Sequence, residues 1–450
     1  MLRNLIIAIL FLSLSVFSQQ NNEPIKVTGK TLFGKSINGE SIREVVGNVV
    51  MIQGNVRITC DKAIQNITQN NAELIGSVHA VQDSIEIFTE RGFYYGNQKY
   101  TYSYENVKLL DGSIVLTAKR GYYYFEEERA EFYENVKLVD SASTLTSDFL
   151  IYFEQLNKAV SVGNVKIADE KSEIFSDSLV HWRDTKLTHA QRNVKIISRE
   201  DALEITGQKM IDDNQTLTTK ISGNPELTKI DTTESGAVDT LFIKSDFMEA
   251  INDSTKKLIA EGNVHILRGG FSSVNDYSIL FRLDDKIVTY QFDEEKRKPI
   301  MWFEESQLSG DSIAIYLFES ELKQIDIFYD GLIVSKKEGY EYRFDQISGN
   351  KIKLMFNQRK LERTYVDENV LSIYFMFEEE EPNGLLKSSA DSAKIFLENN
   401  KVKDVRLFGA VKSEYHPENL VVSKEQEFTL PRFVIHLNRP KRNDFIINKN

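Results

Sequence analysis

The sequence predicts an all-β protein built as an array of short, stacked, antiparallel strands. One observation is a repeat: patterns such as VGNVK (162–166) recur at a constant step of 29 residues, with valines at Val49, Val78, Val107, Val136, Val165 and Val194. A second is composition, because the segments are rich in Val, Ile, Tyr, Phe and Thr, and the 450 residues include only seven prolines; this favours strands over helices. A third is the alternation of apolar residues at every second position, as on one face of a strand.

Other positions keep the same step from the recurring valine. Two residues after it stand Met51, Ala80, Leu109, Leu138, Ile167 and Ile196. Nine residues after it stand Ile58, Ile87, Leu116, Leu145, Ile174 and Leu203, and sixteen after it Tyr94, Tyr123, Tyr152 and His181. One unit of two or three short strands has one apolar face and cannot bury it alone. Neighbouring units must therefore stack around a shared core.

The residue before each valine is usually Asn, which tolerates the left-handed conformation of a tight turn. We expect this turn to mark where each pair of strands begins. Eleven residues after the valine the side chains are mostly small, and Cys60 stands in that set beside Thr, Ala and Ser. A buried small residue explains Cys60, since a nucleophile would need a base held nearby.

The repeat divides the chain into two predicted modules. The 29-residue step fades after Val194, and the polar segment 222–239, which contains Pro225, is the best candidate for a boundary or an insertion. The pattern returns at 243–266, and three hairpins are predicted at 308–328, 347–366 and 388–407. We predict tandem modules at 25–225 and 240–415, and a C-terminal tail at 416–450 whose end, RPKRNDFIINKN, looks loosely ordered.

The N-terminus predicts export. Residues 1–18 are typical of a cleaved signal peptide, because a basic start precedes an apolar run at 5–17 that is shorter than the ~20 residues a membrane helix needs. No later run reaches ~18 apolar residues. The formal net charge of -12 argues against nucleic-acid binding. A single cysteine forbids an intrachain disulfide.

No set of residues predicts catalysis, a metal or a cofactor. His181 and His189 are eight residues apart, but no compatible third ligand accompanies them. The acidic run Glu378 to Glu381 lacks the alternating Asp/Asn spacing of a calcium loop. We therefore predict a protein that is not an enzyme.

Four segments carry a family resemblance: SVGNVKIADEKSEIFSDSLVHW (161–182), ENVKLVDSASTLTSDFLIYF (134–153), GNVRITCDKA (54–63) and IKSDFMEAINDSTKKLIAEGNVHI (243–266). Their GNV turn followed by the SD motif resembles the organic-solvent-tolerance protein A family, the OstA-like, LptA-type periplasmic domain of lipopolysaccharide transport. The resemblance covers residues 40–270 well and 300–410 more weakly. It implies an open β-jellyroll whose apolar interior carries the acyl chains of lipid A, with subunits or partner domains joined end to end.

The resemblance leads us to expect a non-enzymatic periplasmic bridge for lipopolysaccharide that contributes to outer-membrane assembly, free in the periplasm or associated with the outer membrane. Its expected partners are lipopolysaccharide, transport components at both membranes that bind the end strands, and further copies of the chain. The candidate lipid-binding residues, chosen from the middle of the array, are Ile87, Leu116, Leu145, Ile174, Tyr123 and Tyr152. The alternative is a structural or adhesive exported β-solenoid with a dry, packed core, whereas an exported hydrolase is weakly supported.

Overall fold

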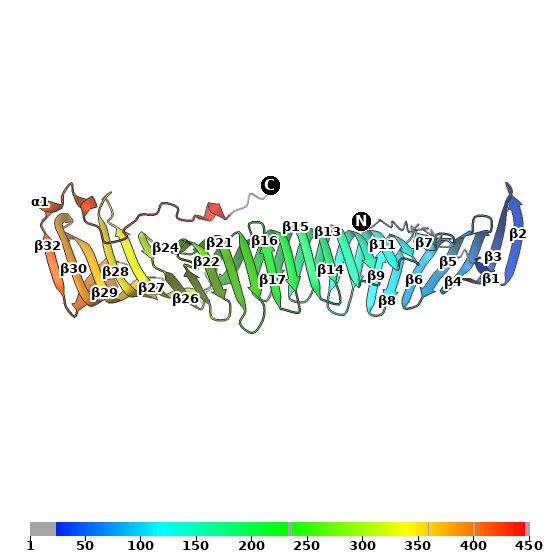
Figure 1. Cartoon of the computed structure of the whole chain (residues 1–450), viewed down its shortest axis with the longest axis horizontal. Coiled ribbons are helices and arrows are strands. Elements are labelled where there is room, and N and C mark those ends of the chain that lie inside the picture. The colour runs from blue at the N-terminus through cyan, green and yellow to red at the C-terminus, as the bar shows by residue number, and fades with distance from the viewer. Residues whose placement is uncertain (1–23, 233–235, 237, 359, 399–400, 446–450) are drawn as a thin grey trace, which may run out of the picture. The chain divides into compact units, whose positions relative to one another are not determined.

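A computed structural model describes residues 24–445 except 233–235, 237, 359 and 399–400. Nearly all of its regular structure is antiparallel strand (Figure 1), which confirms the predicted all-β class. The predicted signal peptide, residues 1–18, lies outside the described residues. The chain divides into two compact units, the first ending at Glu134 and the second beginning at Asn135. Within the described ranges, no helix is long and apolar enough to cross a membrane.

Unit 1 contains strands β1 to β10 and the start of β11. Their bounds are β1 Lys26–Thr28, β2 Thr31–Ile37, β3 Glu40–Gln53, β4 Val56–Asn66, β5 Asn71–Gln82, β6 Ile85–Tyr95, β7 Tyr100–Ser103, β8 Val107–Asp111, β9 Ile114–Ala118, β10 Arg120–Tyr124 and β11 Arg129–Val139.

Unit 2 contains the end of β11, strands β12 to β32 and three short helical turns. The strands are β12 Thr144–Phe153, β13 Lys158–Ala168, β14 Ser172–Trp182, β15 Leu187–Ser198, β16 Leu203–Asp213, β17 Thr218–Ser222, β18 Glu226–Thr232, β19 Val238–Lys244, β20 Phe247–Ile251, β21 Lys257–Arg268, β22 Phe271–Phe281, β23 Lys286–Tyr290, β24 Ile300–Phe303, β25 Ser306–Ser309, β26 Ser312–Phe318, β27 Glu321–Lys336, β28 Phe344–Asn357, β29 Lys360–Glu378, β30 Glu381–Glu398, β31 Lys401–Phe408 and β32 Lys412–His416. The helical turns are α1 Glu418–Val421, η1 Glu425–Glu427 and η2 Arg442–Asp444.

The recurring turn lies within a long strand in β3, β5, β11, β13, β15 and β21, whereas at Val107 it stands between β7 and β8. The expectation that it begins each strand pair is therefore wrong for most copies. In β13, Val162 pairs with Ser178 of β14 and Val165 pairs with Ser176. Gly163 and Asn164 therefore stand opposite one residue, which is a β-bulge. Both adopt positive φ, 79° and 45°. The bulge bends the strand, and its two halves belong to different layers.

An aspartate from the preceding strand holds this bend. The Asn164 side chain donates a hydrogen bond from Nδ2 to Asp148 Oδ2 at 2.7 Å, and a Cβ added at Gly163 would lie 2.5 Å from the same carboxylate oxygen. Asn263 and Asp246 form the equivalent bond at 2.8 Å. The GN and SD motifs that recur along the sequence are thus two parts of one structural corner.

The small side chains eleven residues after each valine also serve the bend. The Ser147 hydroxyl donates to the carbonyl oxygen of Phe149 at 3.0 Å, and the Cys60 thiol donates to that of Lys62 at 3.2 Å. These bonds satisfy carbonyl groups at the kink, where the strand ladder is interrupted. Cys60 is buried, and burial raises the pKa of its thiol to about 11. The interpretation of Cys60 as a buried small residue is confirmed.

The two layers face each other across an apolar interior. We call the strand halves that contain the recurring valine the first layer, and the other halves the second layer. In unit 1, the hydroxyl of Tyr94 in the second layer donates to Oε1 of Gln53 in the first layer at 2.6 Å. In unit 2, the rings of Phe303 and Phe356, one from each layer, lie 4.9 Å apart between centroids. The interior of each unit therefore lies between its two layers.

The polar segment 222–239 lies within unit 2. It contains the whole of β18 and the start of β19, and these strands pair with each other and with β16 and β21 in the first layer. The three predicted hairpins are formed by β26 and β27, by β28 and β29, and by β30 and β31. The division into two tandem modules, 25–225 and 240–415, stays a prediction.

The C-terminal tail lies against the outer face of the first layer in unit 2. Gln346 donates from Nε2 to the carbonyl of Phe428 at 3.0 Å and accepts from the amide of Leu430 at 2.8 Å. Gln307 makes the same pair of bonds with Val434 and His436, both at 2.8 Å. Because these glutamines alternate with interior residues along their strands, they point away from the interior.

The tail is ordered further than its composition suggests. Val421 and Leu430 are buried against an apolar cluster that includes Val334 and Phe375, and the ring of Phe445 lies 5.6 Å from that of Phe242. The prediction of a loosely ordered end is therefore wrong as far as residue 445, because apolar contacts fix it. Residues 446–450 lie outside the described residues.

Candidate functional site

An unbroken row of mostly aliphatic side chains lines the first layer in each unit. In unit 1 the row is Met51, Ile58, Ala80, Ile87, Leu109 and Leu116, each the cross-strand partner of the next. In unit 2 it is Leu145, Ile167, Ile174, Ile196, Ile205, Leu227, Ile243 and Ile266. As far as Ile196, the sets found two and nine residues after the recurring valine thus alternate along a single line, and beyond it Ile205 takes the place expected for Leu203. We call each line the apolar row of its unit.

Five of the six predicted lipid-binding residues are buried in the interior. The exposed fractions are 6% for Ile87, 0% for Leu116, 3% for Tyr123, 5% for Leu145 and 3% for Tyr152. Ile174, in the apolar row of unit 2, is half-buried. Tyr123 and Tyr152 come from the second layer, and the other four come from the first. Their contact with lipid stays a prediction.

In unit 1 the interior is packed, and hydrogen bonds join its two layers at the edge where the strand-ending turns meet. We call this edge the mouth. Gln53 donates from Nε2 to the carbonyl of Gly96 at 3.1 Å, and Gln82 donates to that of Phe125 at 3.4 Å. Each glutamine stands four residues after a recurring valine and reaches a turn 43 residues further on. A side chain at this position can therefore bridge the mouth.

Unit 2 has charged bridges across its mouth from residue 201 onward. The contacts are Arg282 Nη1 to Asp201 Oδ2 at 2.6 Å, Lys229 Nζ to Asp285 Oδ1 at 3.7 Å, and Arg268 Nη2 to the carbonyl of Ser320 at 3.0 Å. The side chains of Arg268 and Arg282 are only 2% and 8% exposed. Breaking such a buried pair is costly, because the remaining charge loses its partner.

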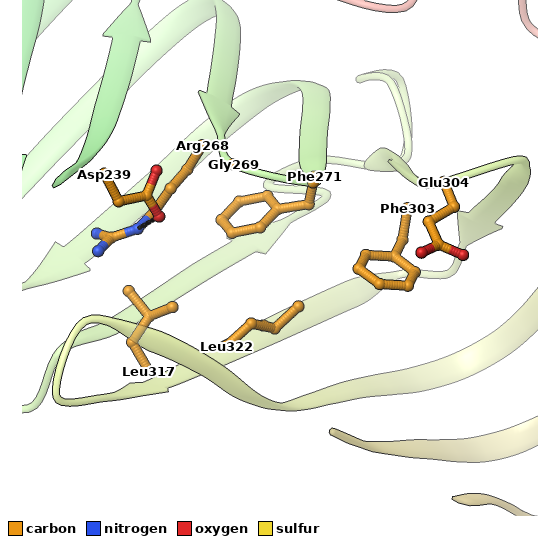
Figure 2. A pocket seen from close by; sticks show the side chains of 9 residues that line it. Asp239, Arg268, Gly269, Phe271, Phe303, Glu304, Leu317 and Leu322 are labelled. Carbon is orange, nitrogen blue, oxygen red and sulfur yellow. Dashed lines mark hydrogen bonds and ion pairs between the residues drawn. The ribbon is translucent and has the colours of Figure 1, made fainter. Parts of the chain in front are cut away.

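A cavity of about 220 Å³ opens beside Arg268. Figure 2 shows its walls, with the rings of Phe271 and Phe303 beside Leu317 and Leu322. The Arg268 guanidinium is paired there with Asp239 at 3.3 Å and with Asp231 at 2.8 Å. The cavity therefore offers apolar contacts, and its cation is already neutralised.

The mouth is arranged differently at the start of unit 2. Asp140 and Asp169 stand at the positions equivalent to Gln53 and Gln82, four residues after Val136 and Val165. Each carboxylate turns back on its own loop: Asp140 accepts from the amides of residues 142 and 143 at 2.8 and 2.7 Å, and Asp169 from those of 171 and 172 at 2.7 and 2.6 Å. Loop geometry thus occupies the side chains that would otherwise bridge the two layers.

Interior residues beside these aspartates are correspondingly less covered. Ile167, Ile174 and Ile196 of the apolar row are half-buried, whereas their neighbours in the row, Leu145 and Ile205, are 5% and 4% exposed. We call the three isoleucines the open section.

The second layer is polar where it faces the open section. Cross-strand partners there are His181, Thr188, Asp212 and Thr219, which we call the polar row. The His181 Nδ1 atom lies 3.0 Å from the Thr188 hydroxyl, and the Thr219 hydroxyl donates to Asp212 Oδ1 at 2.6 Å. Burial lowers the pKa of His181 and raises that of Asp212. Both shifts favour the uncharged forms.

Part of the polar row was visible in the sequence. His181 occupies a position that holds tyrosine in three other repeats, and this substitution was its visible signal. Asp212 and Thr219 were missed because the loop 199–202 shifts the step, so their alignment with His181 depends on strand register. The ring of His189 packs against Trp182. Among the residues that the structure describes, no three His, Cys, Asp or Glu side chains are placed to hold a metal ion.

Free strand edges stand at the beginning of unit 1 and the end of unit 2. Strand β2 pairs with β3 on one side and is exposed along its whole length, with Leu32 and Phe33 52% and 59% exposed. Strand β31 pairs with β30, and Val405 and Phe408 on it are 47% and 42% exposed. Such edges can accept a further strand through their backbone groups.

Comparison with known proteins finds a family similar to part of this chain. Residues 28–177, one third of the 450 residues, match the family described as OstA-like protein. No curated protein matches the chain. The resemblance inferred from the repeated motifs is confirmed over the matched residues.

Proposed function

We propose that this protein is a non-enzymatic carrier of lipopolysaccharide in the periplasm, because residues 28–177 match the OstA-like protein family. The family points to a role in transport of lipopolysaccharide or other lipids. The observation that most directly supports a carrier is the apolar row, which presents aliphatic side chains on successive strands of each unit.

The apolar row suits movement of an acyl chain. Burying one methylene group stabilises a complex by about 0.8 kcal/mol, so the free energy of an acyl chain falls when it enters the interior. Neighbouring strands lie about 4.8 Å apart and present similar side chains. A chain that moves by one strand therefore exchanges one aliphatic contact for another, with little change in free energy. No bond is made or broken by the protein.

The free edges of β2 and β31 support end-to-end assembly in this proposal. Among the described residues, β2 pairs only with β3 and β31 only with β30, and both strands carry exposed apolar side chains. We propose that these edges bind transport components at the two membranes or further copies of this chain. Export by the signal peptide at 1–18 would deliver the protein to the periplasm, where it is free or associated with the outer membrane.

Photo-crosslinking in living cells tests the proposal. A photoreactive amino acid at Leu116 or Leu145 should capture lipopolysaccharide, because both side chains face the interior. Val115 and Thr146 are matched controls, since adjacent residues of a strand point to opposite faces. Failure of capture at both interior positions, or equal capture at the controls, would contradict the carrier function.

The structural or adhesive solenoid remains a second candidate because the interior of unit 1 is tightly filled. Tyr94, Leu109 and Leu116 are at most 1% exposed, as a dry core requires. This alternative predicts no lipid in purified protein and no envelope defect when the protein is depleted. Mass spectrometry of extracted lipids distinguishes the two, since a carrier should retain acylated lipid.

A further inference from the structure

We propose that the open section and the polar row of unit 2 form a lateral entry site, where an acylated lipid places its chains on the isoleucines and its hydroxyl or amide groups on the polar row. This inference rests on the proposed carrier function and adds the position of entry and the chemistry of the lipid recognised there.

The gradient of burial along the apolar row supports this position. Ile167, Ile174 and Ile196 are half-buried, whereas Ile243 and Ile266 further along the same row are 1% and 0% exposed. A chain that enters at the open section is already in line with the buried part of the row. It can then advance strand by strand without crossing a polar barrier in the first layer.

The mouth contacts support the same position. From residue 201 onward the mouth is bridged by the Arg282–Asp201 pair, the Lys229–Asp285 pair and the Arg268 bond to Ser320. Beside the open section, Asp140 and Asp169 accept hydrogen bonds from their own loops instead. Entry at the open section therefore breaks none of these three bridges, whereas entry further along must separate the largely buried Arg282 guanidinium from Asp201 or remove the buried Arg268 guanidinium from the Ser320 carbonyl.

The polar row selects the part of the lipid beside the acyl chains. Thr188 and Thr219 each bond one neighbour and keep further hydrogen-bonding capacity. His181 has a lowered pKa and is therefore neutral near pH 7, and Asp140 and Asp169 add negative charge at the mouth. The cations beside these aspartates already have partners: Arg199 donates to the carbonyls of residues 169 and 170 and to Glu173, Lys171 donates to Glu200, and Arg183 also has an interaction. Hydroxyl and amide groups, which are uncharged and both donate and accept hydrogen bonds, fit this surface better than phosphate groups.

Time-resolved crosslinking with the purified full-length protein tests the position of entry. A photoreactive residue at Ile174 or Ile196 should form adducts with purified lipopolysaccharide before one at Ile266, which lies in the same row beyond the bridges. A photoreactive residue at Ile205 should form adducts earlier in the variant Arg282→Ala than in the protein that keeps Arg282, because the variant lacks the bridge to Asp201. Adducts that form at Ile266 as early as at Ile174 would overturn the entry site.

Paired threonine variants test the chemistry. Thr188→Val and Thr219→Val keep the side-chain shape but remove a hydroxyl, so each should weaken lipopolysaccharide binding roughly fivefold, the equivalent of about 1 kcal/mol for one hydrogen bond. Thr289→Val is the matched control, since Thr289 is buried in β23 away from the polar row. Binding of a hydrocarbon such as hexadecane, which has no polar groups, should change equally little in all three variants. Equal lipopolysaccharide affinity in the three variants would overturn the role of the polar row.

The two proposals fail in distinguishable ways. Capture at Leu116 or Leu145 without capture at Ile174 or Ile196 overturns the entry site and leaves the carrier function standing. Absence of capture at all four positions overturns both.

Discussion

Substitution of the glycine at the strand corner should destabilise unit 2 more than the same change at an uncrowded turn. Gly163 has a φ of +79°, and an added Cβ would lie 2.5 Å from Oδ2, 3.0 Å from Cβ and 3.1 Å from Cγ of Asp148. Because the whole aspartate side chain is close, rotation of its end cannot relieve the clash. Gly163→Ala must therefore displace Asp148 and break its bond with Asn164.

The expected magnitude follows from two contributions. The left-handed conformation costs a non-glycine residue about 1 kcal/mol, and loss of an exposed, charge-assisted hydrogen bond with the accompanying displacement adds roughly 1 to 2 kcal/mol. Gly163→Ala should therefore cost about 2 to 3 kcal/mol in free energy of unfolding. Gly339 has a similar φ of +82° but no atom within 4 Å of an added Cβ. Gly339→Ala should accordingly cost only about 1 kcal/mol.

Urea unfolding followed by tryptophan fluorescence measures the difference. The chain has two tryptophans, so Trp302→Phe leaves Trp182, which pairs with Lys158 on the strand that contains Gly163. Trp182 therefore reports on the corner itself, which is useful in a repeat protein because each repeat contacts mainly its neighbours. If the two alanine variants unfold at the same urea concentration, the corner does not depend on close contact between Gly163 and Asp148.

Two further outcomes are expected. Burial raises the pKa of Asp212 above its ordinary 3.8. The stability that the protonated Asp212 contributes is therefore fully present below pH 3.8 and is lost as the pH rises through the raised pKa. Asp212→Asn should stabilise the protein against urea at pH 7 and have no effect near pH 3, and destabilisation at pH 7 would contradict burial as the cause. Gln346→Ala removes two hydrogen bonds to the tail backbone, about 2 kcal/mol in total, so proteolysis near Leu430 should become faster than in the exposed-glutamine control Gln215→Ala, and equal rates would show that apolar contacts alone hold the tail.

The interior position of a candidate site residue was predictable where that residue follows the 29-residue repeat. Ile87, Leu116 and Leu145 keep the 29-residue step, and all three prove to be interior. Ile174 keeps the same step, yet it is only half-buried, and Asp140 and Asp169 at the mouth bond to their own loops. Those contacts are set by individual loop conformations, which the repeat does not encode.

The tail shows the same limit in another form. Its composition predicts loose order, because local sequence near residues 439–450 has no strand periodicity. Gln307 and Gln346 bind its backbone across more than eighty residues of sequence. An interaction between a side chain and a distant main chain leaves no repeating pattern, so only the folded structure reveals it.

By itself the sequence determined the all-β class, the 29-residue spacing, the interior side of each strand and the family resemblance, because alternation and repetition are properties of neighbouring residues. Tertiary structure alone decided that the Gly–Asn pair is a bend within a strand, that two sequence columns merge into one apolar row, and that the mouth is bridged in some places and open in others. Each of these depends on register and on contacts between the two layers. Such contacts join residues tens of positions apart, and their free energies appear only once the chain has folded.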